Sequence, residues 1–368
     1  MKRKGLIDKK ILFVSSNIGK EYTGANVCSM RNLQICKMIF CENNLTINSL
    51  LPFSLNNISI WKKVLKLLNA IINLSCGYSN GSSKKKEREI VDFVKENCID
   101  YVFVDSSLNG TLVKRLKDET NAFVLAFFHN CEKYMIKGEV KSGNFLAGIR
   151  FFSVSGNERK TCGYADKIIV LNQRDSKLIE TEYKRSSDLL LPISLSDSFD
   201  EKKIISRRIN GRKKGLFVGS YFFGNIEGLS FFFQKVLPFV EMELVIVGRG
   251  MSRLKVNNPN VTIYDGVEDI ASFYLDADFV IAPIISGGGM KVKIAEAMMY
   301  GKIIIGTPES FEGYESIPYS YVCKEPVDFI QVINTLSGNS YNKDVRNYFK
   351  NNFETNMLVN RFSSLFLS

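Results

Sequence analysis

The stretch Ile284-Ile-Ser-Gly-Gly-Gly-Met-Lys-Val-Lys-Ile-Ala-Glu-Ala-Met-Met-Tyr-Gly-Lys-Ile-Ile-Ile-Gly-Thr-Pro308 decides the fold prediction. It combines the end of a strand, three glycines and a helix predicted over residues 291–299. Glycines 287–289 let backbone N–H groups approach a phosphate because no Cβ stands in the way. The helix N-terminus adds partial positive charge at the same point. The stretch therefore predicts a phosphate-binding loop, with a flexible glycine loop as the alternative.

The charges of this helix favour the same interpretation. Lys291 and Lys293 fall in its first turn, where cations destabilise a helix by about a few tenths of a kcal/mol or more. An anionic ligand at that end of the helix would offset this destabilisation. Glu296 follows one turn later. Its carboxylate suits two adjacent ribose hydroxyls, because a charge-assisted hydrogen bond contributes about 1.5–3 kcal/mol.

Apolar runs and helix-like segments alternate on both sides of this stretch. The C-terminal half contains five predicted strands, at residues 216–218, 243–247, 261–264, 279–282 and 302–305. The N-terminal half contains four more, at residues 11–14, 101–104, 123–128 and 167–171. Between the halves, residues 194–214 are charged and lack periodicity, which predicts a linker. Strands alternating with helices predict an α/β protein with two doubly wound domains, and ligands bind at the carboxyl ends of such sheets.

The composition agrees with a folded protein of two domains. The chain has 368 residues, of which 45% are hydrophobic and 24% charged, so disorder is excluded. Its net charge of +11 favours phosphate-rich partners, although a lysine-rich composition of the kind that AT-rich genomes produce is an equal explanation. No motif of a nucleic-acid-binding module is present, so we expect no nucleic-acid partner.

The cysteines and the N-terminus predict a cytoplasmic location. Eight cysteines are scattered without a CxxC pair, and His129 is the only histidine, which argues against a Cys/His zinc site. Free thiols are typical of a reducing compartment. The first apolar run, Ile11 to Val14, is too short for a signal peptide, and no stretch is long enough to span a membrane.

One segment suggests contact with the inner face of a membrane. Apolar residues from Trp61 to Ile72 follow helical spacing, and lysines and asparagines occupy the other face. A basic amphipathic helix of this kind lies on anionic membranes. A helix packed on its own domain with a solvated lysine face is the alternative.

The stretch from Ile284 to Pro308 resembles the donor-site signature of retaining, family 4 type glycosyltransferases with the GT-B fold. Neighbouring motifs occur in the family's order: Leu216-Phe-Val-Gly-Ser220, Leu244-Val-Ile-Val-Gly-Arg249, Asp265-Gly-Val267 and Ala277-Asp-Phe-Val-Ile-Ala-Pro283. The match covers residues 215–315 closely and the N-terminal half more loosely.

The resemblance implies two Rossmann-like domains that face a central cleft. Residues 1–193 would form the acceptor-binding domain, 194–214 the linker and 215–349 the nucleotide-sugar-binding domain. A C-terminal helix at about 350–368 would pack back on the first domain.

The resemblance also implies residue roles. Lys293 would face the donor diphosphate and His129 the transferred sugar, as the two catalytic residues. The remaining donor-side residues would be Gly219 and Ser220 lining the cleft, Val267 at the base, Gly287, Gly288, Gly289, Met290 and Lys291 at the diphosphate or sugar, and Glu296 at the ribose. On the acceptor side it implies Gly24 and Ala25 in the first loop, and Asn130 and Glu132 in a His-Asn-x-Glu element. On sequence alone, His129 could equally be a structural histidine.

The chain departs from the family pattern in two places. Position 288 is glycine where the family has a glutamate that contacts the sugar, and residues 221–225 contain no cation where the family has an Arg/Lys pair. Lys291 and Lys293 would then carry the phosphate charge. No Asp-x-Asp element follows a strand, so we expect no metal and no other cofactor.

These residues predict a retaining glycosyltransferase that moves a sugar from a nucleotide-sugar to a glycan or lipid-linked hydroxyl. The pathway implied is bacterial surface polysaccharide synthesis. The alternatives are a nucleotide-sugar epimerase on the same fold and a non-catalytic relative that binds nucleotide-sugar or a membrane enzyme.

Overall fold

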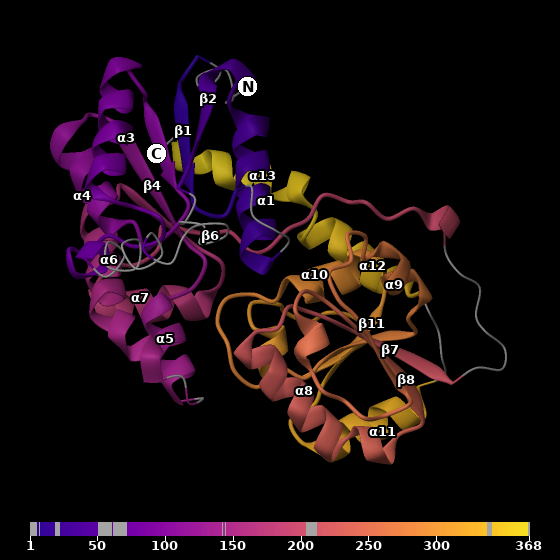
Figure 1. Cartoon of the computed structure of the whole chain (residues 1–368). Helices are drawn as coiled ribbons and strands as arrows, with labels where there is room; N and C mark the ends of the chain where they lie inside the picture. Colours follow the sequence, from indigo (N-terminus) through magenta and orange to yellow (C-terminus); the bar gives the residue numbers. More distant parts are fainter. Residues whose placement is uncertain are drawn as a thin grey trace. The chain divides into compact units, whose positions relative to one another are not determined.

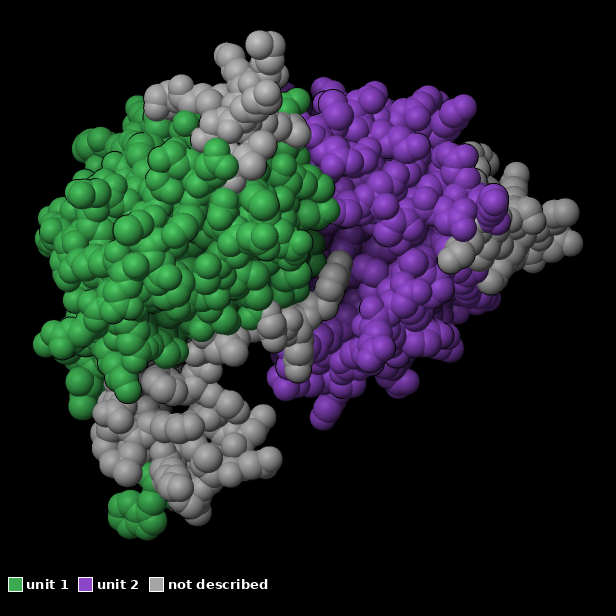
Figure 2. Space-filling model, turned by 90° about the horizontal axis from the view of Figure 1, so that it is seen from above, with its two compact units in different colours: residues 1–192, 358–368 green, residues 193–357 purple. Residues whose placement is uncertain are grey.

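A computed structural model describes residues 6, 8–18, 23–50, 61, 72–141, 143, 145–203, 212–336 and 341–366. The chain forms two compact units, which Figure 2 distinguishes by colour. Unit 1 comprises residues 1–192 and 358–368, and unit 2 comprises residues 193–357. The predicted amphipathic helix from Trp61 to Ile72 lies, apart from its two end residues, outside the described residues.

Unit 1 is built on a parallel sheet in the order β2-β1-β3-β4-β5-β6 (Figure 1). Its strands are β1 (Ile11–Ser15), β2 (Leu45–Ser49), β3 (Tyr101–Val104), β4 (Phe123–Phe128), β5 (Lys167–Val170) and β6 (Leu189–Leu190). Its helices are α1 (Gly24–Ile39), α3 (Lys84–Glu96), α4 (Gly110–Glu119), α5 (Glu132–Lys141), α6 (Phe151–Tyr164) and α7 (Gln173–Tyr183). All four strands predicted in this half are present.

Each face of this sheet is covered by helices because buried parallel strands carry apolar residues on both faces. Leu12 and Val14 face the apolar side chains of α3 and α4. On the other face, Phe13 stacks on Phe103 at 5.0 Å between ring centroids, and Phe103 contacts Phe362 near the end of the chain. Residues 358–366 thus pack within unit 1.

Unit 2 contains a second parallel sheet, in the order β12-β11-β10-β7-β8-β9. Its strands are β7 (Lys213–Val218), β8 (Met242–Val247), β9 (Val261–Tyr264), β10 (Phe279–Ala282), β11 (Ile303–Gly306) and β12 (Ser320–Val322). Its helices are α8 (Phe223–Lys235), α9 (Ala271–Asp276), α10 (Val292–Met299), α11 (Pro326–Thr335) and α12 (Lys343–Asn352), while α13 (Thr355–Ser363) begins in unit 2 and ends in unit 1. The five strands predicted here are all present.

The segment predicted as a linker differs from the prediction at both ends. Lys213 and Lys214 already belong to β7, where they pair with Met242 and Glu243 of β8. At the other end, the backbone N–H of Leu195 donates to the carbonyl of Phe353 at 2.9 Å. The sequence did not predict these two backbone contacts because the segment is charged and lacks periodicity. Backbone pairing does not require apolar side chains.

Each sheet contains one point where the strand order reverses. In unit 1 the reversal lies between β1 and β3, and in unit 2 it lies between β7 and β10. The loops after two such strands diverge to opposite faces, which leaves an open crevice at their carboxyl ends where open α/β sheets bind ligands. The two reversal points therefore indicate where a site belongs in each unit.

Candidate functional site

In unit 2 the glycine loop lies at the reversal point. β10 leads into residues 283–291 and then into α10, while Gly219 and Ser220 follow the neighbouring strand β7. Gly287 has a backbone φ of +153° and Gly289 one of +57°. Residues other than glycine rarely adopt such values. The backbone of the predicted phosphate loop thus requires glycine at two of its three positions.

Lys291 closes this loop. It occupies the N-cap of α10, which has no side-chain cap and no acidic residue in its first turn. Its Nζ lies 2.8 Å from Glu309 Oε1 and donates to the carbonyl of Gly289 at 3.1 Å. Tyr314 donates its hydroxyl to the carbonyl of Lys291 at 2.8 Å. The ammonium group of Lys291 therefore has an acidic partner in the structure.

Lys293 occupies a different environment. Its side chain is buried, with 8% exposed, and its Nζ donates to Asn225 Oδ1 at 2.9 Å. Nζ also lies 3.9 Å from the centroid of the Phe217 ring. Burial, with the nearby charge of Lys291, lowers the pKa of Lys293 to about 7. An arriving diphosphate would raise this pKa again, because a dianion stabilises the ammonium form.

Gly219 makes room for this lysine. A Cβ at Gly219 would lie 3.0 Å from Lys293 Nζ and 2.8 Å from Asn225 Nδ2. Those distances are tighter than ordinary contacts, so a larger residue would displace the ammonium group. Gly219, Asn225 and Lys293 thus form one packed group at the β7–β10 reversal point.

The remaining donor-side residues spread along the same edge. Glu296 is buried and accepts a hydrogen bond from the Tyr274 hydroxyl at 2.8 Å. Met290 turns its sulfur inward, where it accepts from the backbone N–H of Ile193 at 3.4 Å. Val267 is half-buried in the loop after the edge strand β9. The structure therefore brings Gly219 close to Lys293 and leaves Val267 on a separate loop.

In unit 1 the polar side chains meet at the β1–β3 reversal point. Asp105, directly after β3, is fully buried and accepts from Ser15 Oγ at 2.8 Å and from Asn32 Nδ2 at 2.9 Å. His129 follows β4, and its Nε2 lies 3.1 Å from the Asp105 carbonyl oxygen and 3.4 Å from Asp105 Oδ1. Ser29 Oγ of α1 lies 3.5 Å from the same nitrogen. The imidazole is thus held by one of its two nitrogens.

This arrangement sets the charge of His129. Burial alone would lower its pKa, but the charge of Asp105 and then Cys28 outweigh burial and hold the pKa well above its usual value. Nδ1 makes no hydrogen bond to any residue that the structure describes. A protonated His129 would therefore carry one buried N–H donor without a partner, which a sugar hydroxyl could reach only if neighbouring side chains move.

A buried guanidinium lies beside this histidine. Arg31 Nη2 is 3.4 Å from Cys28 Sγ, and its guanidinium carbon lies 5.7 Å from the Phe127 ring centroid. Burial raises the pKa of the Cys28 thiol, but Arg31 and His129 outweigh burial and lower it overall. Arg31 and His129 thus stabilise the negative charge of a Cys28 thiolate.

Asn130 and Glu132 continue the chain from His129 into α5. Asn130 Nδ2 donates to Glu132 Oε1 at 3.1 Å. The fully buried Glu158 accepts from the backbone N–H of Glu132 at 2.7 Å and of Lys133 at 3.2 Å. Burial raises the pKa of Glu158 to about 7. Glu158 therefore fixes the first turn of α5.

Gly24 and Ala25 form the exposed first turn of α1. Thr23 caps that helix through the backbone N–H of Asn26. The loop before it, residues 19–22, lies outside the described part of the chain. The acceptor role of both residues therefore remains a prediction.

Sequence reasoning missed the partners of both catalytic candidates, Asp105 and Asn225. Asp105 had a usable signal, because it directly follows the apolar run of β3 and parallel strands bring their carboxyl ends together. Asn225 follows the Leu216–Ser220 motif of the resemblance, but its contact with Lys293 arises only through the fold.

Residues 212–339 match the family model described as "Glycosyl transferases group 1". Among solved structures, the chain is similar to a sucrose-phosphate synthase from Thermosynechococcus elongatus, with a TM-score of 0.71, 13% identity and coverage of 97% of this chain and 98% of that one. It is also similar to HepE of Anabaena in complex with UDP-glucose, with a TM-score of 0.64, 11% identity and coverage of 97% and 99%.

The lipopolysaccharide outer core galactosyltransferase WaaB gives a TM-score of 0.62 at 13% identity, with coverage of 97% and 99%. No curated protein matches the chain in sequence. The family match shows that residues 212–339 are similar to glycosyltransferases, and the structural likeness shows the GT-B fold over nearly the whole chain.

Proposed function

We propose that this enzyme transfers a sugar, with retention of configuration, from a nucleotide-sugar to a hydroxyl of a glycan or lipid-linked acceptor. The observation that carries the proposal is the packed group of Gly219, Asn225 and Lys293 beside the glycine loop. It combines a buried ammonium, a helix N-terminus and glycine backbone at a strand-order reversal. Together these features suit a diphosphate.

The main task of the protein is to stabilise charge that develops on the departing diphosphate. The amides of residues 287–290 and the Lys293 ammonium would donate to it, in surroundings where burial strengthens electrostatic interactions. Lys291, already paired with Glu309, would hold the loop in shape and add charge. Glu296 would bind the ribose, and Val267 and Ser220 would line the nucleotide site.

On the sugar side, His129 would donate Nδ1–H to a hydroxyl of the transferred sugar. Retention is supported by the absence of any other histidine in the chain, because inverting relatives place a basic histidine in the first loop. The acceptor hydroxyl would then attack from the face that the diphosphate leaves. Asn130, Glu132, Gly24 and Ala25 would lie on the acceptor side.

The comparisons also bear on the acceptor, the location and the donor. The comparison with WaaB, an enzyme of the lipopolysaccharide outer core, supports a role in surface polysaccharide synthesis at the inner face of the membrane. Structures of HepE hold UDP-glucose, UDP and glucose, which makes UDP-glucose the first donor to test. Among the described residues, no helix has both the length and the apolar character needed to cross a bilayer.

The test is sugar transfer by Lys293→Ala and His129→Ala, after a thermal-shift panel of nucleotides and their sugars has identified the donor. Losing one donor to the developing charge costs about 2.7–4 kcal/mol, so we expect turnover to fall roughly a hundredfold or more. Lys302→Met is a matched control, because Lys302 is also a buried lysine of unit 2 but donates to the carbonyl of Ala277. Normal transfer by both alanine variants would overturn the proposed site.

Two further conditions separate the proposal from its alternatives. An epimerase would convert the donor without an acceptor, whereas a transferase needs one. Because backbone amides and Lys293 would supply the charge, we expect activity to survive a chelator. Activity that disappears with chelator and returns with a divalent cation would contradict a metal-independent reaction.

A further inference from the structure

A carboxylate lies against the glycine loop of unit 2. Glu309 belongs to the 3-10 helix η7 (Pro308–Phe311), which follows β11, the strand next to β10. Because neighbouring parallel strands end at the same edge of a sheet, η7 and the glycine loop meet there. A Cβ at Gly287 would lie 3.9 Å from Glu309 Oε1. The carboxylate is therefore within van der Waals distance of the space beside the loop.

Buried polar contacts fix the position of η7. Thr307, which precedes it, donates its hydroxyl to the carbonyl of Ile284, and its backbone N–H donates to the carbonyl of Ala282 at 3.2 Å. Ser310 also donates its hydroxyl to the carbonyl of Ala282. Both hydroxyl-bearing residues are buried. Glu309 thus lies between two residues that are anchored to the end of β10 and its exit, so its place at the loop is set by the fold.

The ion pair with Lys291 does not by itself account for a carboxylate here. Lys291 Nζ lies 2.8 Å from Glu309 Oε1, but it also donates to the carbonyl of Gly289 at 3.1 Å, so the backbone helps to hold the ammonium group. A negative charge beside an anion-binding loop repels the anion, and more strongly where little water screens it. An uncharged acceptor would hold Lys291 without that repulsion.

The chemistry of a carboxylate indicates which part of a ligand it suits. Its oxygens accept hydrogen bonds and donate none, so its partners are N–H or O–H groups. An ionised diphosphate offers no such group, whereas each free hydroxyl of a sugar does. In a nucleotide-sugar the anomeric carbon is bonded through oxygen to the terminal phosphate, so phosphates on the amides of residues 287–290 would bring the sugar beside this loop. The Glu309 side chain is 19% exposed, so part of it is accessible there.

We propose that Glu309 binds a hydroxyl of the donor sugar and thereby favours the sugar nucleotide over the free nucleoside diphosphate. The ligand class is a nucleotide-sugar that directs an O–H group at the space beside Gly287. This inference rests on the proposed function, because it requires the diphosphate to lie on residues 287–290. Glu309 contacts the sugar and repels the phosphate, so it determines specificity.

The test is titration calorimetry of the full chain with UDP and with UDP-glucose, for wild type and Glu309→Gln. If the thermal-shift panel selects another donor, that sugar nucleotide and its nucleoside diphosphate take their place. Loss of a charge-assisted hydrogen bond should weaken sugar-nucleotide binding about tenfold or more. UDP should bind equally well or more tightly, because a repelling charge is gone. Retained UDP binding also shows that the variant folds.

The quantity that decides is the Kd for UDP-glucose divided by the Kd for UDP. We expect this ratio to rise at least about tenfold in Glu309→Gln. If Glu309 serves only to brace Lys291 and the loop, both ligands should weaken by the same factor. An unchanged ratio would therefore overturn the proposal.

Glu227 provides a matched control at the same loop. It is exposed and accepts a hydrogen bond from the hydroxyl of Ser286, directly before the three glycines. Glu227→Gln thus removes one negative charge near the loop but not the carboxylate beside Gly287, so the ratio should stay at the wild-type value. A rise as large as that in Glu309→Gln would mean that net charge, and not a contact, controls the selection, and the proposal would be wrong.

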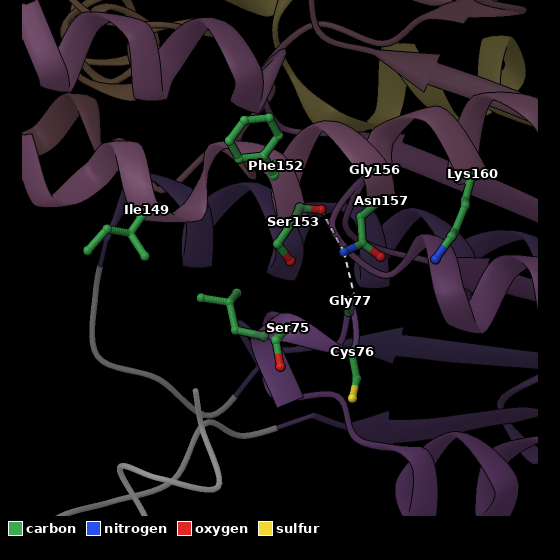
Figure 3. A pocket seen from close by; sticks show the side chains of 10 residues that line it. Ser75, Cys76, Gly77, Ile149, Phe152, Ser153, Gly156, Asn157 and Lys160 are labelled. Atoms are coloured by element: carbon green, nitrogen blue, oxygen red, sulfur yellow. Dashed lines mark hydrogen bonds between the residues drawn. The ribbon is translucent and has the colours of Figure 1, made fainter. Parts of the chain in front are cut away.

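A second control addresses binding at another hollow. Unit 1 contains a pocket of about 440 Å³, a volume that can hold a sugar (Figure 3). Its amide donor, Asn157 Nδ2, donates to the carbonyls of Gly77 at 2.7 Å and Ser153 at 3.0 Å. Gly156 lines the pocket, and a Cβ there would meet open space, so Gly156→Leu fills the pocket. Both Kd values should be unchanged. A loss of UDP-glucose affinity as large as in Glu309→Gln would place the sugar in unit 1 and overturn the proposal.

The outcomes for this inference and for the proposed function are distinguishable. If no sugar nucleotide or nucleoside diphosphate of the panel binds the wild type, the proposed function fails, and the role of Glu309 fails with it. If UDP binding depends on Lys293 but the ratio is unchanged in Glu309→Gln, the proposed function stands and the role of Glu309 alone is rejected.

Discussion

At the residue scale, the charge of Lys293 is the property on which the proposed chemistry depends. Its pKa of about 7 means that the free enzyme holds this proton only in part at neutral pH. Because the pKa is lowered on folding, the unfolded chain binds more protons between about pH 7 and the ordinary lysine value of about 10.4. Stability from this group therefore increases as pH rises through that window.

Binding of a diphosphate should reverse this effect. We expect UDP to bind with uptake of a proton at pH 8, because the ligand raises the pKa of Lys293. Titration calorimetry in two buffers of different ionisation enthalpy measures that uptake. In Lys293→Met the uptake should disappear and affinity should lose most of its pH dependence. Equal proton uptake by wild type and variant would show that Lys293 does not face the phosphate.

His129 allows an unusually clear measurement, because it is the only histidine in the chain. Its imidazole signals in an NMR titration therefore need no assignment, and we expect a pKa well above the ordinary value. Asp105→Asn keeps the shape but removes the carboxylate that raises this pKa, so the titration should move to lower pH. An unchanged titration would mean that Asp105 does not set the charge of His129.

The stability that His129 contributes changes with pH in the opposite direction to the stability that Lys293 contributes. Since folding raises the pKa of His129, its contribution to stability is complete below about pH 6.5 and is lost as pH rises through the folded value. In Asp105→Asn the folded pKa of His129 is lower, so this loss should be smaller and should end at a lower pH. Thermal unfolding of both proteins across the range provides an independent check on the titration.

His129 was predicted as a candidate because it follows an apolar strand, and Lys293 because it falls in the first turn of the helix after three glycines; the resemblance implied their roles. It did not allow their partners to be predicted. Asp105 lies 24 residues before His129, and Asn225 lies 68 residues before Lys293. Which polar groups meet depends on strand order, and strand order is not visible in local periodicity.

At the element scale, the two helices that follow site loops begin differently. α10 has no side-chain cap and no acidic residue in its first turn, so no side chain of the cap accepts from its first N–H groups. α5 begins on the buried carboxylate of Glu158 instead. One helix N-terminus thus suits an external anion, and the other is already satisfied by the protein.

Glu158 makes the stability of α5 dependent on pH. Burial raises its pKa to about 7, so the folded chain binds more protons than the unfolded chain between about pH 4.3 and 7. Stability from this group therefore falls as pH rises through that window. We expect the melting temperature of wild type relative to Glu158→Gln to fall from pH 5 to pH 7.5. A constant difference across this range would contradict the assigned pKa.

The elements themselves were largely predictable, and those that were not share a physical reason. The nine strands predicted from apolar runs are all present, whereas β2, β6 and β12 were missed. β2 is half-exposed, and β6 and β12 contain only two and three residues. All three are edge strands. An edge strand is only partly buried, so it does not need a continuous run of apolar residues.

At the scale of the whole molecule, sequence similarity and fold cover different parts of the chain. The family model matches residues 212–339, while the structural likeness covers 97% of the chain. Under the proposed function, glycines and lysines of unit 2 would bind a phosphate, and this requirement would explain why the family model matches that unit.

The sequence does not identify the donor sugar. In the family pattern a carboxylate at position 288 contacts the donor sugar, and this chain has glycine there. A backbone amide and a carboxylate make opposite demands on a sugar hydroxyl, so this substitution bears on donor choice. The thermal-shift panel of sugar nucleotides addresses that question before any acceptor is known.

The central claim is that unit 2 receives a diphosphate at the glycine loop and Lys293, and a crystal structure of the enzyme with bound UDP tests it most directly. We expect phosphate oxygens within hydrogen-bond distance of backbone amides in residues 287–290, and Lys293 Nζ turned from Asn225 toward the ligand. A nucleotide bound elsewhere, or a Lys293 ammonium that still contacts only Asn225 beside an occupied site, would contradict the account.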